Sequence, residues 1–488
     1  MDELHRLSRR VLMGSFVGTV APDWARRELE NGLGGVCLFG TNTRLDAAGP
    51  QQSGEQLVTA LATQLHQGGA RVVVALDEEG GDVTRLHYAS GSPHAGHAVL
   101  GRADDIELTR AVAGALGSDL RRAGVDLDFG PVADVNSERD NPVIGTRSFG
   151  AEPGLVARHT AAWVQGLQQA GVGACLKHFP GHGATTVDSH LGLPTVHDDA
   201  EVLRARDLIP FAAGVRAGAV AVMTSHLMVP ALDAHLPATF SAAVLGLLRS
   251  ELGFEGLLAS DALDMVGASG GRGVPAAGVL ALRAGVDLLC LGSDGTADQL
   301  EAASRAIVDA VRQGELSIDR LRQAAARVET AVTSLASLRE QAGDVADDGS
   351  SAAAATAALQ VDGPLPPMLG ARVVRLDAGS NQAVGEVPWG VLAGLSVLVP
   401  SACTDVAVDV DLTRLGPEPV VALVREVHRH PPLLAALRRL VAHRPDLVVV
   451  DMGWGEADLN LPVTVVRSWG ASAASTAAVD RLLVEGRS

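Results

Sequence analysis

The segment RVVVALDEEGG at residues 71–81 decides the expected fold, because a continuous apolar run passes directly into a cluster of acidic residues. An unbroken run of Val, Ala and Leu is typical of a parallel strand that is buried on both faces. Seven further apolar runs occur before about residue 335, at 11–18, 34–40, 125–135, 173–179, 219–227, 255–265 and 285–292. Helix-like segments separate them, so the pattern predicts an α/β protein with a (β/α)8 TIM-type barrel. A doubly wound open sheet is the alternative.

The chain continues into a second, smaller α/β unit. A helix-like segment at 317–343, with Ser317 as its expected N-cap, ends the barrel, so we assign residues 1–342 to a catalytic barrel domain. Residues 343–367 are rich in Gly, Asp, Ser and Pro, which predicts a linker with room for one Ala-rich helix. Residues 368–488 are assigned to a C-terminal α/β sandwich domain, with apolar runs at 371–377, 395–400, 419–427, 446–453 and 463–469. No strand leads into GxGxxG or GxxxxGK[ST], so nothing indicates a nucleotide site.

Composition excludes several classes of partner. The net charge of −18 disfavours nucleic acid as the main partner, because an acidic surface repels phosphate. No apolar run reaches the roughly 18 residues that a membrane span needs. The four cysteines are widely spaced and show no disulfide or metal-binding pattern. We read the N-terminal segment as a first strand rather than a signal peptide, and expect a cytoplasmic protein; the oligomeric state is left open.

Reactive side chains gather where the predicted strands end, which is where barrel enzymes carry their active sites. A lone Asp at a strand end is more often a cap and a lone loop Arg more often a surface charge, so Asp134 and His226 are read as structural. The coincidence of so many groups on one rim indicates a functional site. The groups are Asp77, Arg85, Arg147, Lys177, His178, Asp188, His190 and Asp261.

These residue types suit glycoside hydrolysis with retention of configuration. A carboxylate at Asp261 could attack an electrophilic carbon, and such enzymes pair a nucleophile with an acid/base group. The imidazole of His190 can donate and then accept a proton near neutral pH, and Asp188 can orient the ring. Asp77, Arg85, Arg147, Lys177 and His178 would supply donors and acceptors for sugar hydroxyls and an acetamide.

The motif KHFPGHG-x4-DSH at 177–190 resembles glycoside hydrolase family 3, and specifically its β-N-acetylglucosaminidase (β-N-acetylhexosaminidase) branch. LDEEGG (76–81), GPVADV (130–135), GTRSFG (145–150) and SDALDM (260–265) support the resemblance. It covers residues 11 to about 335, and more weakly the C-terminal segment 468–483.

The resemblance implies that Asp261 is the nucleophile, His190 the acid/base and Asp188 its dyad partner. It also implies that Asp77, Arg85, Arg147, Lys177 and His178 bind the sugar, and that no metal or other cofactor takes part. The implied partners are small N-acetylglucosaminides, such as muropeptide or chitin fragments, with no nucleic acid or membrane. Related β-glucosidases take an acid/base Glu from the second domain; the intact DSH loop predicts that this second domain is structural or assists assembly. Asp82 departs from the family, which often has Arg there.

Three alternatives remain open at this point. The site could act as a phosphorylase, because a neutral His tolerates an approaching phosphate better than a carboxylate would. His178, His182, Asp188 and His190 could form a metallohydrolase centre, although Pro180 and Gly181 prevent the helix that would align the first two. A sugar-binding protein without activity is the third.

Overall fold

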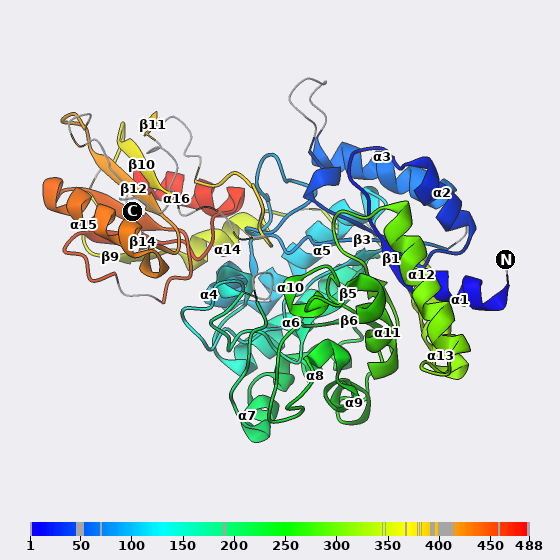
Figure 1. The fold of residues 1–488 in the computed structure, drawn as a ribbon. Helices are drawn as coiled ribbons and strands as arrows, with labels where there is room; N and C mark the ends of the chain where they lie inside the picture. Colours follow the sequence, from blue (N-terminus) through cyan, green and yellow to red (C-terminus); the bar gives the residue numbers. More distant parts are fainter. Residues whose placement is uncertain are drawn as a thin grey trace.

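The structure, a computed structural model, has two α/β parts (Figure 1). It describes residues 2–44, 53–68, 71–188, 192–343, 345–346, 348–366, 368–377, 379, 381, 383–390, 396–398, 412, 415–456 and 459–485. The larger part is coloured blue to green in Figure 1, and the smaller part is mainly orange and red.

Eight short parallel strands form the sheet of the larger part, in the order β7-β6-β5-β4-β3-β2-β1-β8. An isolated parallel bridge between Ala259 and Leu288 brings the two ends of the sheet together. The barrel is therefore confirmed over the open-sheet alternative. Its strands are β1 Leu12–Gly14, β2 Gly35–Leu38, β3 Val73–Leu76, β4 Leu127–Asp128, β5 Gly173–Phe179, β6 Ala221–Thr224, β7 Leu257–Ala259 and β8 Leu289–Cys290.

Helices surround this sheet because their apolar faces pack on the outer side chains of the strands. The Ser317 hydroxyl accepts a hydrogen bond from the Asp319 N–H at 3.2 Å, which confirms Ser317 as the N-cap of α13. The helices are α1 Glu3–Arg10, α2 Asp23–Glu30, α3 Gly54–Gln67, α4 His97–Ala103, α5 Ile106–Arg122, α6 Pro153–Gln169, α7 Ala200–Ala205, α8 Leu208–Arg216, α9 Ala242–Ser250, α10 Val266–Ser269, α11 Val274–Ala284, α12 Ala297–Arg312 and α13 Ile318–Gln341. Short 3-10 helices are η1 Gly40–Asn42, η2 Gly145–Arg147 and η3 Ala238–Phe240.

The interior of the barrel is filled by inward-facing side chains of the strands, and Val328 and Leu335 of α13 belong to the same cluster. Cys37, Cys175 and Cys290 lie in this cluster as free, buried thiols and pack there as small apolar side chains. Cys403 lies outside the described residues. Because the interior is packed, a ligand cannot bind inside the barrel. A binding site is therefore expected at the carboxyl ends of the strands, as in other barrels of this type.

The smaller part is a six-stranded sheet in the order β11-β10-β12-β13-β14-β9, covered on both faces by helices. Leu433 and Leu437 of α15 pack on one face, and Val479 and Leu483 of α16 on the other, which makes the expected α/β sandwich. All pairs are parallel except β14 with β9. The elements are β9 Gln360–Asp362, β10 Arg372–Leu376, β11 Ser396–Leu398, β12 Val420–Val424, β13 Val448–Asp451, β14 Thr464–Arg467, η5 Val427–Arg429, α15 Pro431–His443 and α16 Ala473–Glu485.

The segment 343–367, expected to be a linker, contains both α14 (Ser350–Ala358) and β9. Ala354, Ala355 and Ala358 are buried in the same apolar cluster as the outer face of the barrel. In Figure 1, α14 lies between the two parts, and it packs against α4 and α5 of the barrel and against α16. This segment therefore joins the two parts through packed side chains.

Asp82, the departure from the family pattern, bridges the two parts as well. Its Oδ1 accepts a hydrogen bond from the Ala471 N–H at 2.8 Å, and its Oδ2 accepts one from the Thr146 hydroxyl at 2.9 Å. The carboxylate thus ties the loop after β3 to the segment before α16.

Within the part of the chain that the structure describes, no helix combines the length and the apolar character required to cross a lipid bilayer.

Candidate active site

A cavity of about 520 Å³ opens at the carboxyl ends of the barrel strands. It is lined by six of the eight predicted site residues, namely Asp77, Arg85, Arg147, Lys177, His178 and Asp261. Cys37, Met223 and Cys290 of the buried barrel interior also line it, so its inner end is apolar and blind. The topology alone brings these groups together, because parallel strands of a barrel end on the same face.

Glu79, which the sequence analysis did not select, is the centre of a buried charge cluster in this cavity. Its carboxylate accepts two hydrogen bonds from Arg147, from Nε at 2.9 Å and from Nη2 at 2.7 Å. The ammonium of Lys177 lies 2.6 Å from Glu79 Oε1 and 2.6 Å from Asp77 Oδ1. Burial alone would raise the pKa of Glu79, but the charges of Arg147 and Lys177 outweigh it and hold this pKa below its ordinary value.

The same cluster keeps both cations charged. Burial alone would lower the pKa of Lys177, but Asp77 and Glu79 raise it above its ordinary value. Arg147 also donates from Nη1 to the Val143 carbonyl at 3.0 Å, which fixes the plane of its guanidinium. The wall of the cavity therefore presents cations whose positions are set before any ligand arrives.

Replacing Glu79 should destabilise the fold strongly. Glu79→Gln removes the charge that compensates Arg147 and Lys177, and breaking a buried pair typically lowers the free energy of unfolding by about 3–5 kcal/mol. The stabilisation is present at neutral pH and is lost only as the pH falls through the depressed pKa of Glu79 in the folded protein. Chemical denaturation at pH 7 measures the effect.

The matched control for this experiment is Glu251→Gln. Glu251 pairs with Arg204 at 2.9 Å on the surface, where both side chains are well exposed. Exposed pairs contribute little to stability, so we expect a nearly unchanged unfolding midpoint. Equal midpoints for the two variants would show that the Glu79 cluster has no special structural role.

His178 is oriented by Asp134, which the sequence analysis read as a structural cap. Asp134 Oδ2 lies 2.7 Å from His178 Nδ1, and Oδ1 accepts hydrogen bonds from the backbone N–H groups of His178 and His182 at 3.2 and 2.7 Å. Asp134 is completely buried, which alone would raise its pKa, but these contacts lower it. Asp134 is therefore a positioning residue for the cavity wall. His226, read in the same way, is held by Thr239 and the Ala262 carbonyl.

His182 also lines the cavity, although it was considered only as a metal ligand. Its Nδ1 lies 3.0 Å from the Thr185 hydroxyl, and its buried Nε2 has no hydrogen-bond partner. Burial is the main cause that lowers the pKa of His182 to about 4, with the nearby His178 adding to it. At neutral pH the ring is therefore uncharged.

Arg85 is held by one contact to its backbone and by others to its guanidinium. Glu78 Oε2 accepts hydrogen bonds from the N–H groups of Arg85 and Leu86 at 2.8 and 3.0 Å, which shapes the loop after β3. The Arg85 guanidinium lies 3.9 Å from Asp77 Oδ2 and donates to the Ala383 carbonyl at 2.9 Å. Ala383 belongs to the C-terminal part and lines the cavity, so that part contributes to the wall.

Asp261 lies at the rim directly after β7. Ser260, completely buried, accepts a hydrogen bond from the Cys290 N–H at 3.0 Å, which fixes the end of β7 beside β8. Asp261 Oδ1 accepts from the Ala262 N–H at 2.7 Å. Asp264 provides a second carboxylate in the cavity, and its Oδ2 accepts a hydrogen bond from the Ser293 N–H at 3.0 Å.

Of the predicted dyad the structure describes only Asp188, which does not line this cavity. Asp188 is buried in the wall of an adjacent cavity of about 350 Å³. The two cavities share Val143 and Ile144. The polar residues that also line the second cavity include Asp82, Arg425, Glu426, Arg429 and His430. His190 lies outside the described residues. Among the residues that are described, His178, His182 and Asp188 do not form a group with metal-ligand geometry, which gives the metallohydrolase alternative no support.

Residues 20–331 match the model of the glycosyl hydrolase family 3 N-terminal domain. This chain belongs to glycoside hydrolase family 3. The family prediction is therefore confirmed.

Curated relatives in this family are named as hexosaminidases. The chain is 33% identical over 340 residues to beta-hexosaminidase A of Pseudoalteromonas piscicida, a match that covers 65% of this chain and 56% of that relative. It is 37% identical over 278 residues to beta-hexosaminidase LpqI of Mycobacterium tuberculosis, covering 56% and 71%. The chain thus spans little more than half the length of the first of these relatives.

A solved structure resembles both parts of this family 3 chain. It is that of a glycoside hydrolase family 3 beta-N-acetylglucosaminidase from Paenibacillus sp. str. FPU-7, with a TM-score of 0.86 and 29% identity, covering 100% of this chain and 98% of the other. A beta-glucoside phosphorylase, BglX, shares the fold with a TM-score of 0.77 but only 16% identity.

Proposed function

We propose that the protein is a retaining, exo-acting glycoside hydrolase that removes a terminal β-linked N-acetylglucosamine. The observation that carries this proposal is the single cavity that gathers Asp261 with the five predicted sugar-binding residues. The hexosaminidase names of the curated relatives support the choice of sugar.

The shape of the cavity supports removal of one sugar from a chain end. Its volume of about 520 Å³ falls in the range of small-molecule sites, and its inner end is closed by the packed barrel interior. A sugar bound there can extend only outward, so its hydroxyls would face Asp77, Arg85, Lys177 and His178. The fixed donors of Lys177 and Arg147 would bind hydroxyl or acetamide oxygens without reorganising.

In the proposed mechanism, Asp261 attacks the anomeric carbon and the bond to the leaving oxygen breaks. His190 gives its proton to that oxygen, while Asp188 orients the ring and stabilises its charged form. Water then attacks the glycosyl–Asp261 ester, His190 takes the proton, and the sugar leaves with its configuration retained. This sequence requires the His190 ring to lie within proton-transfer distance of the leaving oxygen.

We propose cell-wall muropeptide or chitin fragments as the substrate class. The remainder of such a fragment would extend from the first cavity toward the second, because the two cavities share Val143 and Ile144.

The deciding experiment is a panel of p-nitrophenyl sugars with the purified protein, with and without phosphate. We expect hydrolysis of the β-N-acetylglucosaminide at a rate that phosphate leaves unchanged, and little turnover of the β-glucoside. Accumulation of a sugar 1-phosphate would instead indicate the phosphorylase. An absence of turnover over a broad pH range would leave only a sugar-binding role.

A further inference from the structure

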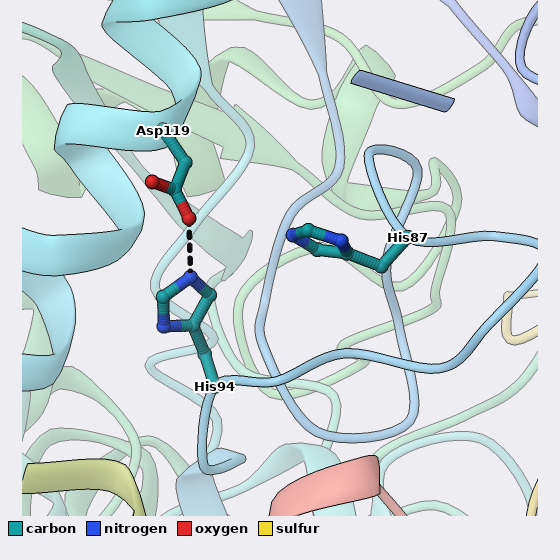
Figure 2. A group of neighbouring side chains, drawn as sticks. All are labelled: His87, His94 and Asp119. Atoms are coloured by element: carbon teal, nitrogen blue, oxygen red, sulfur yellow. Dashed lines mark hydrogen bonds and ion pairs between the residues drawn. The ribbon is translucent and has the colours of Figure 1, made fainter. Parts of the chain in front are cut away.

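Outside the active-site cavity, two histidines of the loop that follows β3 lie close to an aspartate of the neighbouring helix α5. His87 and His94 lie on this loop, and Asp119 lies on α5 (Figure 2). One ligand atom from each of the three lies within 4.8 Å of the other two. Neither cavity includes any of these residues.

The hydrogen bonds of this cluster are incomplete. His94 Nε2 lies 2.8 Å from Asp119 Oδ2, but the buried Nε2 of His87 has no hydrogen-bond partner. In Figure 2 the ring nitrogen of His87 that is farther from its backbone points toward the His94–Asp119 pair. A buried polar atom without a hydrogen-bond partner is costly, and the Nε2 of His87 together with the two neighbouring ligand atoms offers a cation three ligands at one point.

We propose that His87, His94 and Asp119 bind a divalent cation of the zinc class. Two imidazole nitrogens and one carboxylate oxygen suit Zn²⁺, which binds such atoms at about 2.0–2.2 Å in tetrahedral geometry. Tetrahedral bonds of that length place ligand atoms about 3.4 Å apart, so His94 Nε2 and Asp119 Oδ2 move apart from 2.8 Å, while the His87 nitrogen has to lie at a similar distance from both. A water molecule completes the fourth position, because the Asp119 side chain is 20% exposed.

Binding changes the tautomer of His94. The ring proton on Nε2, which is hydrogen-bonded to Asp119 Oδ2, moves to Nδ1 of the same neutral ring, so that Nε2 and the carboxylate both become available to the ion and no proton is released. Nδ1 is buried without a hydrogen-bond partner, so that atom loses no contact when it takes the proton.

The ion would fasten the loop after β3 to the outer helix α5. The same loop carries Arg85 into the active-site cavity, and its Ser92 carbonyl accepts a hydrogen bond from the Ala473 N–H at 3.0 Å. The proposed site is therefore structural: it holds the loop that connects the cavity wall to the C-terminal part, and it takes no part in the reaction.

Titration of the metal-free 488-residue chain with Zn²⁺ against a chromogenic chelator tests the proposal. We expect wild type to bind one equivalent more than His87→Ala and Asp119→Asn, or to bind it at least about tenfold more tightly, since each variant loses one ligand. His235→Ala, which replaces an exposed histidine elsewhere, is the matched control and should bind like wild type. Co²⁺ should give visible absorption bands typical of tetrahedral coordination in wild type and His235→Ala only.

Stability provides an independent readout, because an ion that binds only the folded state raises the melting temperature. Zn²⁺ should raise the melting temperature of wild type more than that of His87→Ala, while the metal-free proteins should melt alike. Equal Zn²⁺ stoichiometry and affinity in all four proteins would overturn the proposal, because any bound ion would then lie elsewhere. Failure of wild type to bind Zn²⁺ would overturn it as well.

Discussion

Asp261→Ala is expected to lower kcat for an aryl β-N-acetylglucosaminide by at least about 10³-fold, because the variant cannot form the covalent intermediate. The loss should appear in kcat, while binding of N-acetylglucosamine should remain, because Arg147 and Lys177 are held by Glu79 and not by Asp261. Steady-state kinetics and calorimetric titration with the sugar measure the two effects separately.

Asp264→Asn is the matched control, because Asp264 lines the same cavity and its carboxylate already accepts a hydrogen bond from the Ser293 N–H. We expect a far smaller loss of kcat. Added azide offers a further test: it can occupy the space left in Asp261→Ala, attack the anomeric carbon and displace the leaving group, giving a glycosyl azide of inverted configuration. Comparable losses in both variants, with no azide product, would contradict the assignment of Asp261.

His190→Ala is expected to reduce kcat by about 10²–10⁴-fold for substrates with poorly acidic leaving groups, because these depend on proton donation in the transition state. Dinitrophenyl substrates leave without protonation, so their formation of the glycosyl-enzyme should be nearly unaffected. Pre-steady-state kinetics with the two kinds of leaving group measure the difference.

His182→Ala is the informative comparison, because His182 is the imidazole in the cavity whose Nε2 is buried without a partner. With its pKa lowered to about 4, mainly by burial, His182 is uncharged at neutral pH and is a poor acid. Its replacement should therefore affect both kinds of leaving group alike. If His182→Ala instead shows the leaving-group dependence, His182 and not His190 is the acid.

The barrel could be predicted because each of its strands is a run of apolar residues long enough to be recognised. The structure places all eight strands inside the predicted runs, although all except β5 are shorter: the run at 125–135 contains only Leu127–Asp128 as β4. Beyond Asp128 the chain still contacts β5, for example through the Ala133 N–H and the Lys177 carbonyl at 2.7 Å, but not as a regular ladder. The length of a strand depends on how many of its residues pair with the neighbouring strands, and the hydrophobic pattern of the sequence does not reveal this pairing.

The prediction of a linker missed β9, because Gln360–Asp362 is a short edge strand next to Gly363 and Pro364. Its strand conformation comes from pairing with β14, about a hundred residues later in the chain. The same segment contains α14, whose small alanines carry a weak apolar signal and yet fit closely against the barrel. The Ala-rich helix is thus expected from its composition, whereas β9 and the packing of α14 depend on contacts with distant parts of the chain.

The residues of the cavity could be predicted when strand ends and the long histidine motif marked them, as for Lys177 and His178. Glu79 and Asp134 could not, because in sequence each is one carboxylate among several near a strand end. Their roles depend on pairing with Arg147 and His178, which follow them by 68 and 44 residues. A signal was available for Glu79, since a buried Lys and Arg on one rim require a compensating carboxylate.

The position of α14 determines where a minimal catalytic fragment can end. Truncation at residue 342, the end of the predicted barrel domain, would remove Ala354, Ala355 and Ala358 from the cluster they share with the barrel. An apolar slot along α4 and α5 would then face solvent and favour aggregation. The shortest fragment that keeps this surface covered runs through residue 358.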